Sequence, residues 1–295
     1  MPVEEGSFKP HLEVIAGSII YGTIGVFLDR VQDMSVGAVL FSRFFFGLCM
    51  IFLYLLLIRR LGQLRPRKNK KYLLLLGFLN SVTALCYFSS IRYSGVSVAV
   101  LLLYTAPVYV NLLAPIILKE PSSSKSFLPL LLAVAGVFLI AQPGDILISA
   151  NTGSDFQKGF IFGLLSGLSS GIMIIVIRYL RHDYTGIAQT FWLTGVSLLF
   201  ILPSAFSTPV YFFLENIYTL ILFGFTITFA AVIYLRGISG IRAQTGSILA
   251  LVEPVSGIFF DTTVLKSPLY TSTFLGCFFI LAAAYLVSRR SLKKA

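Results

Sequence analysis

The stretch VAVLLLYTAPVYVNLLAPIIL, residues 98–118, carries no charged side chain. Roughly 20 apolar residues in a helix are enough to cross the hydrocarbon core of a bilayer. A second stretch, TGSILALVEPVSGIFFDTTVL at residues 245–265, lies 147 residues further on, and its Pro254 matches Pro107 of the first. Because 147 is about half of the 295 residues, the two stretches predict that one hydrophobic unit has been duplicated.

The same offset of 147 pairs further residues without a gap. Matched Leu and Ile mean little in so apolar a chain, whereas matched Gly, Tyr, Pro and Lys in one register are harder to obtain by chance. We therefore expect two repeats, residues 1–147 and 148–295, with Gly144–Gln157 as the linker between them. The further pairs are Gly77-Phe78 with Gly224-Phe225, Tyr87 with Tyr234, Ile91 with Ile238, and Leu118-Lys119 with Leu265-Lys266.

The composition excludes a soluble protein. The chain is 57% hydrophobic and 12% charged, with a mean hydropathy of +0.89, so a soluble fold could not cover its surface with polar side chains. The net charge of +11 does not indicate a nucleic-acid partner, because most Lys and Arg lie in short segments between apolar runs. The lipid bilayer is the expected partner. An apolar belt is common to all membrane proteins and therefore indicates no particular oligomer.

Neither cysteine nor histidine indicates a metal site or a cofactor. Cys49, Cys86 and Cys277 are widely spaced inside apolar runs, which favours buried thiols over a disulfide framework. The two histidines, His11 and His182, sit at the ends of apolar runs and cannot form a cluster of metal ligands.

Ten apolar runs are long enough to span the membrane as helices, whose backbone hydrogen bonds are satisfied internally. Short joints that carry turn and breaker residues separate these runs. The first run follows an acidic start rather than a basic one, so we expect a retained helix rather than a signal peptide. The predicted fold class is an all-α integral membrane protein with ten transmembrane helices, near residues 11–29, 36–58, 71–91, 96–118, 126–143, 158–179, 184–203, 216–235, 240–264 and 270–288.

The basic residues predict how these spans are oriented. With the N-terminus inside, 18 Lys and Arg residues fall in inside segments and four in outside segments, while Arg43 lies within a span. The positive-inside rule therefore predicts that both termini are cytoplasmic. Each half then has five spans, an odd number, so two like halves must cross the membrane in opposite directions. Such a 5+5 inverted repeat is typical of carriers that alternate between inward-open and outward-open states.

Two charged residues lie deep within predicted spans, where charge is costly and tends to be functional. Glu253 is near the centre of its span, where it could bind and release protons near neutral pH or hold a substrate ammonium group. Alternatively, it is a structural acid bonded to a neighbouring helix or to the backbone freed by Pro254. Arg43 lies roughly 10 Å into its span. It could hold a substrate carboxylate or phosphate, or it could pair structurally with Asp261, Asp29 or helix-end carbonyls.

Prolines and polar or aromatic residues complete the candidate site. Pro107 and Pro254 each remove a backbone donor, so the freed carbonyls could face a cavity, with a simple kink as the alternative. The aromatic residues could instead serve packing or interfacial anchoring, and the asparagines could hydrogen-bond between helices. The candidate substrate-binding residues are Tyr21, Asn80, Tyr87, Tyr104, Asn111, Trp192, Tyr234 and Gln244, and the candidate coupling or gating residues are Glu253, Arg43, Pro107 and Pro254.

The sequence lacks the motifs of ATP-driven pumps, zinc proteases and dinucleotide-binding enzymes. With Glu253 as the only central acid, it also lacks the paired acids that a membrane enzyme would need. It favours a plasma-membrane carrier that moves a small polar or amphipathic metabolite by alternating access. Amino acids are candidate substrates, and protons are a candidate coupling ion. The alternative is a facilitator or exchanger of sugar-linked or phosphorylated metabolites, which would need a more basic cavity.

The chain resembles the drug/metabolite transporter superfamily, and within it the EamA-type ten-helix carriers. The resemblance covers nearly the whole chain and rests on the 5+5 duplication and on four local patterns that are weak singly but fairly specific in this order. These patterns are Tyr21-Gly22-Thr23-Ile24-Gly25-Val26-Phe27, Arg43-Phe44-Phe45-Phe46, Tyr104-Thr105-Ala106-Pro107 through Lys119-Glu120, and Leu251-Val252-Glu253-Pro254.

The resemblance implies cytoplasmic termini and a central cavity lined mainly by the third, fourth, eighth and ninth helices, with parts of the first and sixth. It also implies movement of small solutes, often the export of amino acids or related metabolites. The chain departs from the family's pattern at three places. Tyr21 replaces a common tryptophan, Leu168-Ser169-Ser170 stands where an aromatic residue is frequent, and Lys266-Ser267 lacks the acid that often closes the ninth helix.

Overall fold

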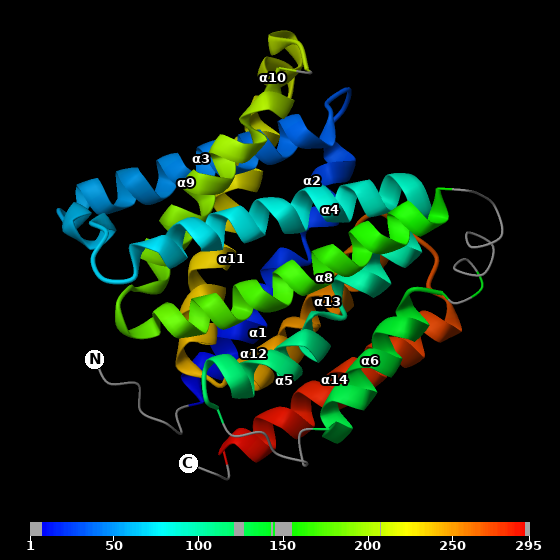
Figure 1. Ribbon diagram of the computed structural model, residues 1–295. Coiled ribbons are helices and arrows are strands. Elements are labelled where there is room, and N and C mark those ends of the chain that lie inside the picture. Colours follow the sequence, from blue (N-terminus) through cyan, green and yellow to red (C-terminus); the bar gives the residue numbers. More distant parts are fainter. Residues whose placement is uncertain (1–7, 121–126, 143, 145–154, 207, 293–295) are drawn as a thin grey trace.

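The computed structural model describes residues 8–120, 127–142, 144, 155–206 and 208–292 (Figure 1). Within these ranges the regular structure is helical and holds no strand, which confirms the expectation of an all-α fold. The α-helices are α1 (Lys9–Tyr21), α2 (Ile24–Arg30), α3 (Val36–Leu57), α4 (Lys70–Leu103), α5 (Ala106–Ile117), α6 (Phe127–Ile140), α8 (Phe156–Tyr179), α9 (Gly186–Ala205), α10 (Val210–Glu215), α11 (Ile217–Gly240), α12 (Ala243–Ala250), α13 (Val252–Thr263) and α14 (Thr271–Leu292).

Helix length and hydropathy identify a membrane protein. Among the described residues, eight helical segments are long and apolar enough to cross a bilayer, and α5 and α6 are shorter apolar helices. The count of ten spans therefore stays a prediction that depends on these two helices. The eight segments are Lys9–Arg30, Val36–Leu57, Lys70–Leu103, Phe156–His182, Gly186–Ala205, Ile217–Gly240, Ala243–Thr263 and Thr271–Arg290. The predicted linker, Gly144–Gln157, lies largely outside the described residues.

The largest departure from the predicted span boundaries is in α4. The sequence predicts a joint between residues 91 and 96, but the helix runs on from Lys70 to Leu103 with one interruption at Gly95. Gly95 has φ 82° and ψ 167°, a conformation that residues with a Cβ atom rarely adopt. A single glycine therefore redirects the chain where a loop was expected, and α4 contains the third predicted span and the start of the fourth.

Three apolar segments are interrupted near the middle of the bundle. α1 passes to α2 at Gly22-Thr23, α4 to α5 at Tyr104-Thr105, and α12 to α13 at Leu251. The hydroxyls of the two threonines donate to the carbonyl oxygens of Ile20 (2.7 Å) and Leu102 (2.6 Å). These bonds satisfy backbone acceptors at helix ends that lie away from the bundle surface.

The two prolines of the predicted repeat follow two of these interruptions. Pro107 is in the first turn of α5 and Pro254 in the first turn of α13, where a helix does not need the backbone donor that proline lacks. The prolines therefore begin new helices rather than kink continuous ones. The interruptions themselves, at Tyr104 and Leu251, are also 147 residues apart.

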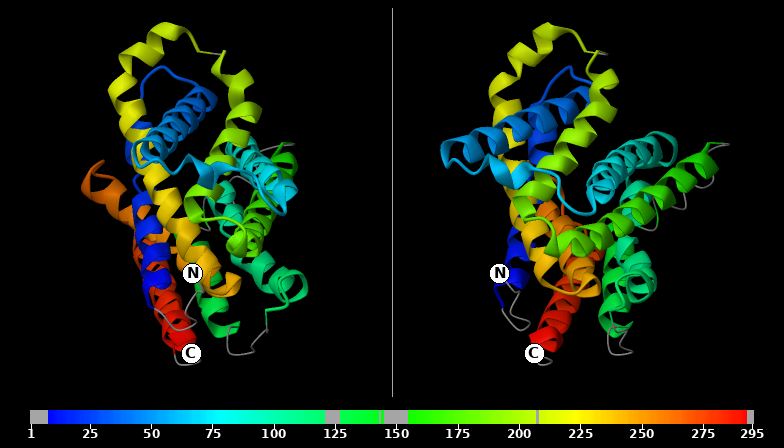
Figure 2. Two further views of the ribbon diagram at one scale, coloured as in Figure 1. Left: turned by 90° about the vertical axis from the view of Figure 1, so that its left-hand side faces the viewer. Right: turned by 60° about the vertical axis from the view of Figure 1, so that its left-hand side comes forward.

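The long helices pack in pairs. α4 lies against α8, α1 against α11, α3 against α9 and against α11, and α6 against α14 (Figure 1). The α6–α14 pair is held at van der Waals distance by two glycines, since a Cβ atom on Gly136 would be 2.7 Å from the carbonyl oxygen of Gly276, and one on Gly276 would be 2.6 Å from that of Gly136. Figure 2 shows α10 projecting at the end opposite to the two termini.

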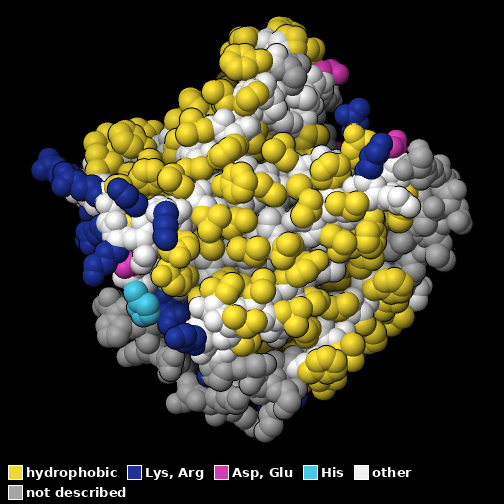
Figure 3. Space-filling view, in the orientation of Figure 1, with side chains coloured by type: hydrophobic (Ala, Val, Ile, Leu, Met, Phe, Trp, Pro, Cys, Tyr) yellow, Lys and Arg dark blue, Asp and Glu magenta, His cyan; other side chains and the backbone are white. Residues whose placement is uncertain are grey.

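The two ends of the bundle differ in their charges. We call the end where α1 begins and α14 ends the terminal end, and the opposite end the distal end. Lys and Arg side chains gather over the joint between α3 and α4 at the left edge of Figure 3, and hydrophobic side chains cover most of the face beside them. This distribution suits a bundle that is immersed in lipid along its middle.

Candidate functional site

A cavity of about 790 Å³ occupies the centre of the bundle. Such a volume is typical of sites for small molecules. Its wall begins near the distal end with Leu28, Ile91, Val96 and Asp261, and it stops at mid-bundle with Ser247. Among the described residues, no terminal-end joint contributes to this wall. The cavity is therefore a blind one, which extends from the distal end to the middle of the molecule.

Glu253 of α13 is in the wall of this cavity, two residues after the interruption at Leu251. The Tyr104 hydroxyl, at the matching interruption between α4 and α5, forms a side-chain hydrogen bond with the Glu253 carboxylate. Arg43 of α3 also lines the cavity and interacts electrostatically with this carboxylate. The two charges that the sequence places deep in spans are thus brought into one cavity.

Arg43 is held by aromatic rings rather than by an acid. Its Cζ atom lies 5.2 Å from the ring centroid of Phe44 and 5.8 Å from that of Phe223, within the range of cation–π attraction. The ion pairs formed in the described part of the chain do not join Arg43 to Asp261 or Asp29. Its guanidinium therefore keeps hydrogen-bond donors for another group in the cavity.

Four tyrosines surround the same carboxylate. Tyr21, Tyr87, Tyr104 and Tyr234 all line the cavity, and each interacts electrostatically with Glu253. The rings of Tyr21 and Tyr234 pack edge to face with their centroids 5.7 Å apart, which joins α1 to α11. The cavity wall therefore combines one carboxylate with several aromatic faces and hydroxyl groups.

Asn80 also lines the cavity but has a partner in the protein. Its side-chain amide donates to the Ser197 hydroxyl at 2.9 Å, and that hydroxyl donates to the carbonyl oxygen of Gly77 at 3.0 Å. These bonds connect α4 to α9, as the interhelical alternative for Asn80 expects.

Three predicted substrate-binding residues lie away from the cavity. The Asn111 amide donates to the carbonyl of Pro107 within its own helix, at 2.9 Å. The Trp192 indole donates to the carbonyl of Leu64 at 3.0 Å, near the terminal end. Gln244 is buried at the start of α12. Asn111 lies about one turn beyond Pro107 in α5, and Pro107 is the last residue of this helix that lines the cavity.

The residues four positions before the two prolines also line the cavity. Because proline has no N–H, the carbonyl groups four residues before Pro107 and Pro254 lack their usual helical donor. Those carbonyls belong to Leu103 and Ala250, and both residues line the cavity together with the prolines.

The sequence interpretation missed a set of small hydroxyl residues in the cavity wall. Such residues are common inside membrane helices as local hydrogen-bonders, so their composition carries no signal of a cavity. Four of them lie inside long helices, far from any helix interruption, so their positions along the chain carry no signal either. They are Thr83, Ser97, Ser170, Thr194, Thr228 and Ser247.

Comparison with known proteins decides the family. The model of the EamA-like transporter family matches residues 9–142 and 157–289. The chain belongs to the EamA-like transporter family. As a transporter of this type, it is 28% identical over 247 residues to an uncharacterized transporter of Archaeoglobus fulgidus, with 82% of each chain covered. The relatives that it matches are transporters rather than enzymes.

Other comparisons include a named exporter and a solved structure with the same fold. It is 25% identical over 201 residues to the pseudopaline exporter CntI of Pseudomonas aeruginosa, covering 65% of this chain and 67% of that one. One solved crystal structure superimposes with a TM-score of 0.78 at 14% sequence identity, covering 96% of this chain and 98% of that chain.

Proposed function

We propose that this transporter moves a small polar metabolite across the plasma membrane by alternating access, in the direction of export. The observation that carries the proposal is the presence of Glu253 and Arg43 in one central cavity of an apolar bundle. Charges at this depth are expensive, so they are retained where a substrate or an ion uses them. The relative named as a pseudopaline exporter supports the direction.

The charges of the cavity favour a zwitterion, with amino acids and related compounds as first candidates. The Glu253 carboxylate can accept hydrogen bonds from an ammonium group, and Arg43 can donate to a carboxylate. Tyr21, with the other cavity tyrosines, offers aromatic surface to the remainder of the substrate. A single arginine does not favour phosphorylated metabolites, which usually recruit several basic groups.

We also propose that the halves 1–147 and 148–295 form an inverted repeat. Two conformations support it besides the matched prolines. The helix interruptions at Tyr104 and Leu251 share one register, and so do the positive φ angles of Lys119 (54°) and Lys266 (60°). A positive φ is uncommon for lysine, so its recurrence at this offset favours a common backbone design.

Helix packing supports the same relation. A shift of 147 residues turns α4 into α11, α9 into α3 and α8 into α1. The contacts of α4 with α9 and with α8 then become those of α11 with α3 and with α1, all of which are present. Gly77 and Gly224, matched residues, each sit where a Cβ atom would clash with the facing helix. With cytoplasmic termini, this arrangement gives the two access states that a carrier needs.

The test of the proposed function is uptake and counterflow in proteoliposomes with a panel of labelled amino acids and metabolites, with and without a pH gradient. We expect Glu253→Gln to fold and to lower transport by about 10- to 100-fold, because a charge-assisted hydrogen bond is lost. Asp261→Asn is the matched control, since Asp261 lies at the distal rim of the same cavity. It should retain most of the activity.

The outcomes separate the alternatives. Gradient-driven accumulation that fails in Glu253→Gln but survives in Asp261→Asn would support a proton-coupled carrier. Counterflow that ignores the gradient would favour a facilitator or exchanger, and would make Glu253 a binding or structural residue. Equal transport by the two variants would remove Glu253 from the proposal.

A further inference from the structure

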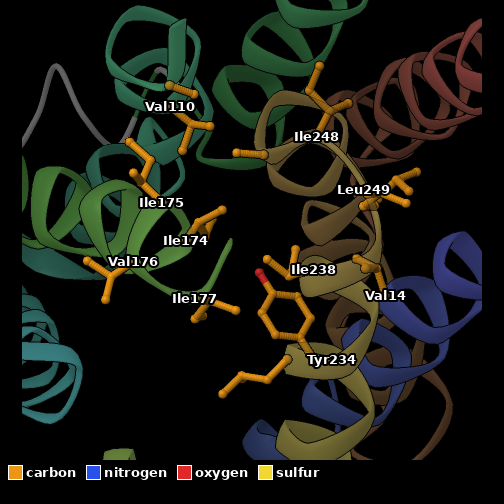
Figure 4. Close-up of a cluster of buried hydrophobic side chains, with 14 of the residues drawn as sticks. Val14, Val110, Ile174, Ile175, Val176, Ile177, Tyr234, Ile238, Ile248 and Leu249 are labelled. Atoms are coloured by element: carbon orange, nitrogen blue, oxygen red, sulfur yellow. The ribbon is translucent and has the colours of Figure 1, made fainter. Parts of the chain in front are cut away.

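An apolar layer separates the mid-bundle end of the cavity from the terminal end of the molecule. Ile174 of α8 and Tyr234 of α11 line the cavity and also belong to a cluster of buried side chains. In Figure 4, side chains of α8 face those of α11 across this layer, with α12 and α1 beside them. The other residues of this buried cluster that Figure 4 labels are Val14, Val110, Ile175, Val176, Ile177, Ile238, Ile248 and Leu249.

Beyond this layer, toward the terminal end, one carboxylate joins several helices. Glu120 follows the end of α5, and its Oε1 atom lies 2.9 Å from Nε of Arg178 and 3.7 Å from Nη1 of Arg181. Its Oε2 atom accepts a hydrogen bond of 2.9 Å from the backbone N–H of Ala243, the first residue of α12. Both oxygens are therefore used, and they link the ends of α5, α8 and α12.

The arginine of this pair extends the connection to two more helices. The Arg178 guanidinium also donates to the carbonyl oxygen of Ser239 in the last turn of α11. The Ser239 hydroxyl in turn accepts from the side-chain amide of Gln189 in α9, at 3.4 Å. All of these helices contribute to the cavity wall, so the network fixes the spacing of the wall at its terminal end.

The Glu120–Arg178 pair is buried, so separating the two side chains at the terminal end costs much free energy. The side chains are 9% and 7% exposed, respectively. Removing either charge from its partner in such a site leaves a buried charge without compensation. If α5 and α12 separate from α8 and α11 to open a path from the cavity to the terminal end, the Glu120–Arg178 contact must break, whereas the hydrogen bond from Ala243 to Glu120 can stay intact.

The residue of the second half that matches Glu120 is not an acid. A shift of 147 residues places Ser267 where Glu120 stands, after lysines whose backbones have the same left-handed conformation. The chain therefore has the same turn at both positions but an acid at only one of them.

We propose that Glu120 is a gating residue that holds the terminal end of the cavity closed, so that the resting protein keeps the cavity accessible from the distal side. This inference rests on the proposed function, because it assigns the closed end in an alternating-access cycle. Transport then requires Glu120 to leave Arg178 in each cycle and to return to it.

The test measures from which side the cavity can be reached, and needs no substrate. A variant without Cys49, Cys86 and Cys277, all of which are free thiols, receives a reporter at Ser170→Cys in the cavity wall of α8. A membrane-impermeant thiol reagent is then applied to either face of oriented vesicles. The parent should react from the distal side and be protected from the terminal side.

Adding Glu120→Gln should raise terminal-side labelling relative to distal-side labelling by about tenfold or more, because the buried pair favours one state. Glu13→Gln is the matched control. It makes the same change at the same end, where Glu13 pairs with Arg236 at 2.8 Å, but that arginine is 58% exposed. In Glu13→Gln, water can solvate the Arg236 that remains, so the labelling ratio should change by less than about twofold.

Arg181→Gln keeps the proposal falsifiable if Glu120→Gln does not fold, since Arg181 is a more distant and more exposed partner of the same carboxylate. We expect a shift of about two- to threefold in the same direction. An unchanged ratio in a folded Glu120→Gln protein, or in Arg181→Gln when Glu120→Gln is unfolded, would overturn the gating role. Failure of the transport assay with a shifted ratio would instead count against the proposed function alone.

Discussion

The terminal and distal ends of the cavity are joined by different kinds of contact. At the terminal end, a buried carboxylate connects the ends of α5, α8 and α12, and an apolar layer lies above it. At the distal end, described contacts between joints are neutral, such as Gln32 N–H to the Asn216 side chain at 3.3 Å and Ser35 Oγ to Thr208 Oγ1 at 3.1 Å. A neutral hydrogen bond costs less free energy to break than a buried ion pair.

This difference explains how a carrier whose halves share one fold can prefer one of its two access states. Two halves with the same fold would by symmetry open either end at similar cost. Side chains placed at only one end remove that degeneracy without changing the helices. The variants below test how much of the preference comes from the buried charges, how much from helix packing at the middle, and whether it can be reversed.

The largest expected effect is on stability at the terminal end. Replacing one partner of Glu120–Arg178 should cost about 3–5 kcal/mol in the free energy of unfolding, because the other charge stays buried. Replacing Glu13 of the Glu13–Arg236 pair should cost about 0–1 kcal/mol, because the Arg236 that remains is 58% exposed and can be solvated. A double-mutant cycle for each pair, followed by unfolding in detergent, gives the two coupling energies.

Equal coupling energies for the two pairs would contradict the comparison. A smaller loss of unfolding free energy in Glu120→Gln when the terminal end is open would support the comparison, because water can then solvate Arg178.

A smaller effect is expected at the middle of the molecule, where α1 passes to α2. A Cβ atom on Gly22 would clash with the Ser256 hydroxyl and would lie 2.6 Å from the backbone nitrogen of Gly257. A Cβ atom on Gly257 would be 3.7 Å from the nearest of these atoms, the carbonyl oxygen of Gly22. Gly22→Ala should therefore lower stability by about 1–3 kcal/mol through overpacking, whereas Gly257→Ala should change it by less than about 1 kcal/mol.

Thermal unfolding of the two alanine variants checks this prediction. If neither variant lowers the unfolding temperature, α2 does not depend on close packing against α13, and the distal half of the cavity is packed more loosely than these distances imply.

Much of the fold was predictable because its signals are local. Apolar runs between basic joints mark the helices, and Pro107 and Pro254 mark the interruptions. The depth of Glu253 and Arg43 in their spans follows from counting residues, and both do line one cavity. Tyr21, Tyr87, Tyr104 and Tyr234, which the sequence offered as candidate binding residues, also line this cavity, and their contact with a substrate stays a prediction.

The rest depends on which helices meet, and a single sequence does not contain that information. Glu120 and Arg178 are 58 residues apart, at the ends of different helices, so each resembles an ordinary charge in a joint. Trp192 looked like a cavity aromatic, but the joint that contains Leu64 folds back to accept its N–H. Asn111 follows Pro107 by about one turn of the same helix, but the depth at which the cavity wall ends along α5 depends on the neighbouring helices.

The smallest expected effect comes from building the missing contact at the distal end. A shift of 147 residues relates Glu120 to Ser267 and Arg178 to Val31, both of which are at least partly exposed. The double variant Val31→Arg with Ser267→Glu should therefore favour a closed distal end. Because the new pair is exposed, distal-side labelling of Ser170→Cys should fall by only about two- to threefold.

The control for this variant is Val31→Gln with Ser267→Gln, which adds similar bulk without charge and should leave labelling unchanged. Each single charged substitution should also be ineffective, because the contact needs both partners. A fall in labelling that appears only with both charges, and that disappears at high salt, would show that the two ends are interchangeable in design. The same fall in the uncharged control would mean that bulk at the rim blocks access, and the ends would then differ in more than their charges.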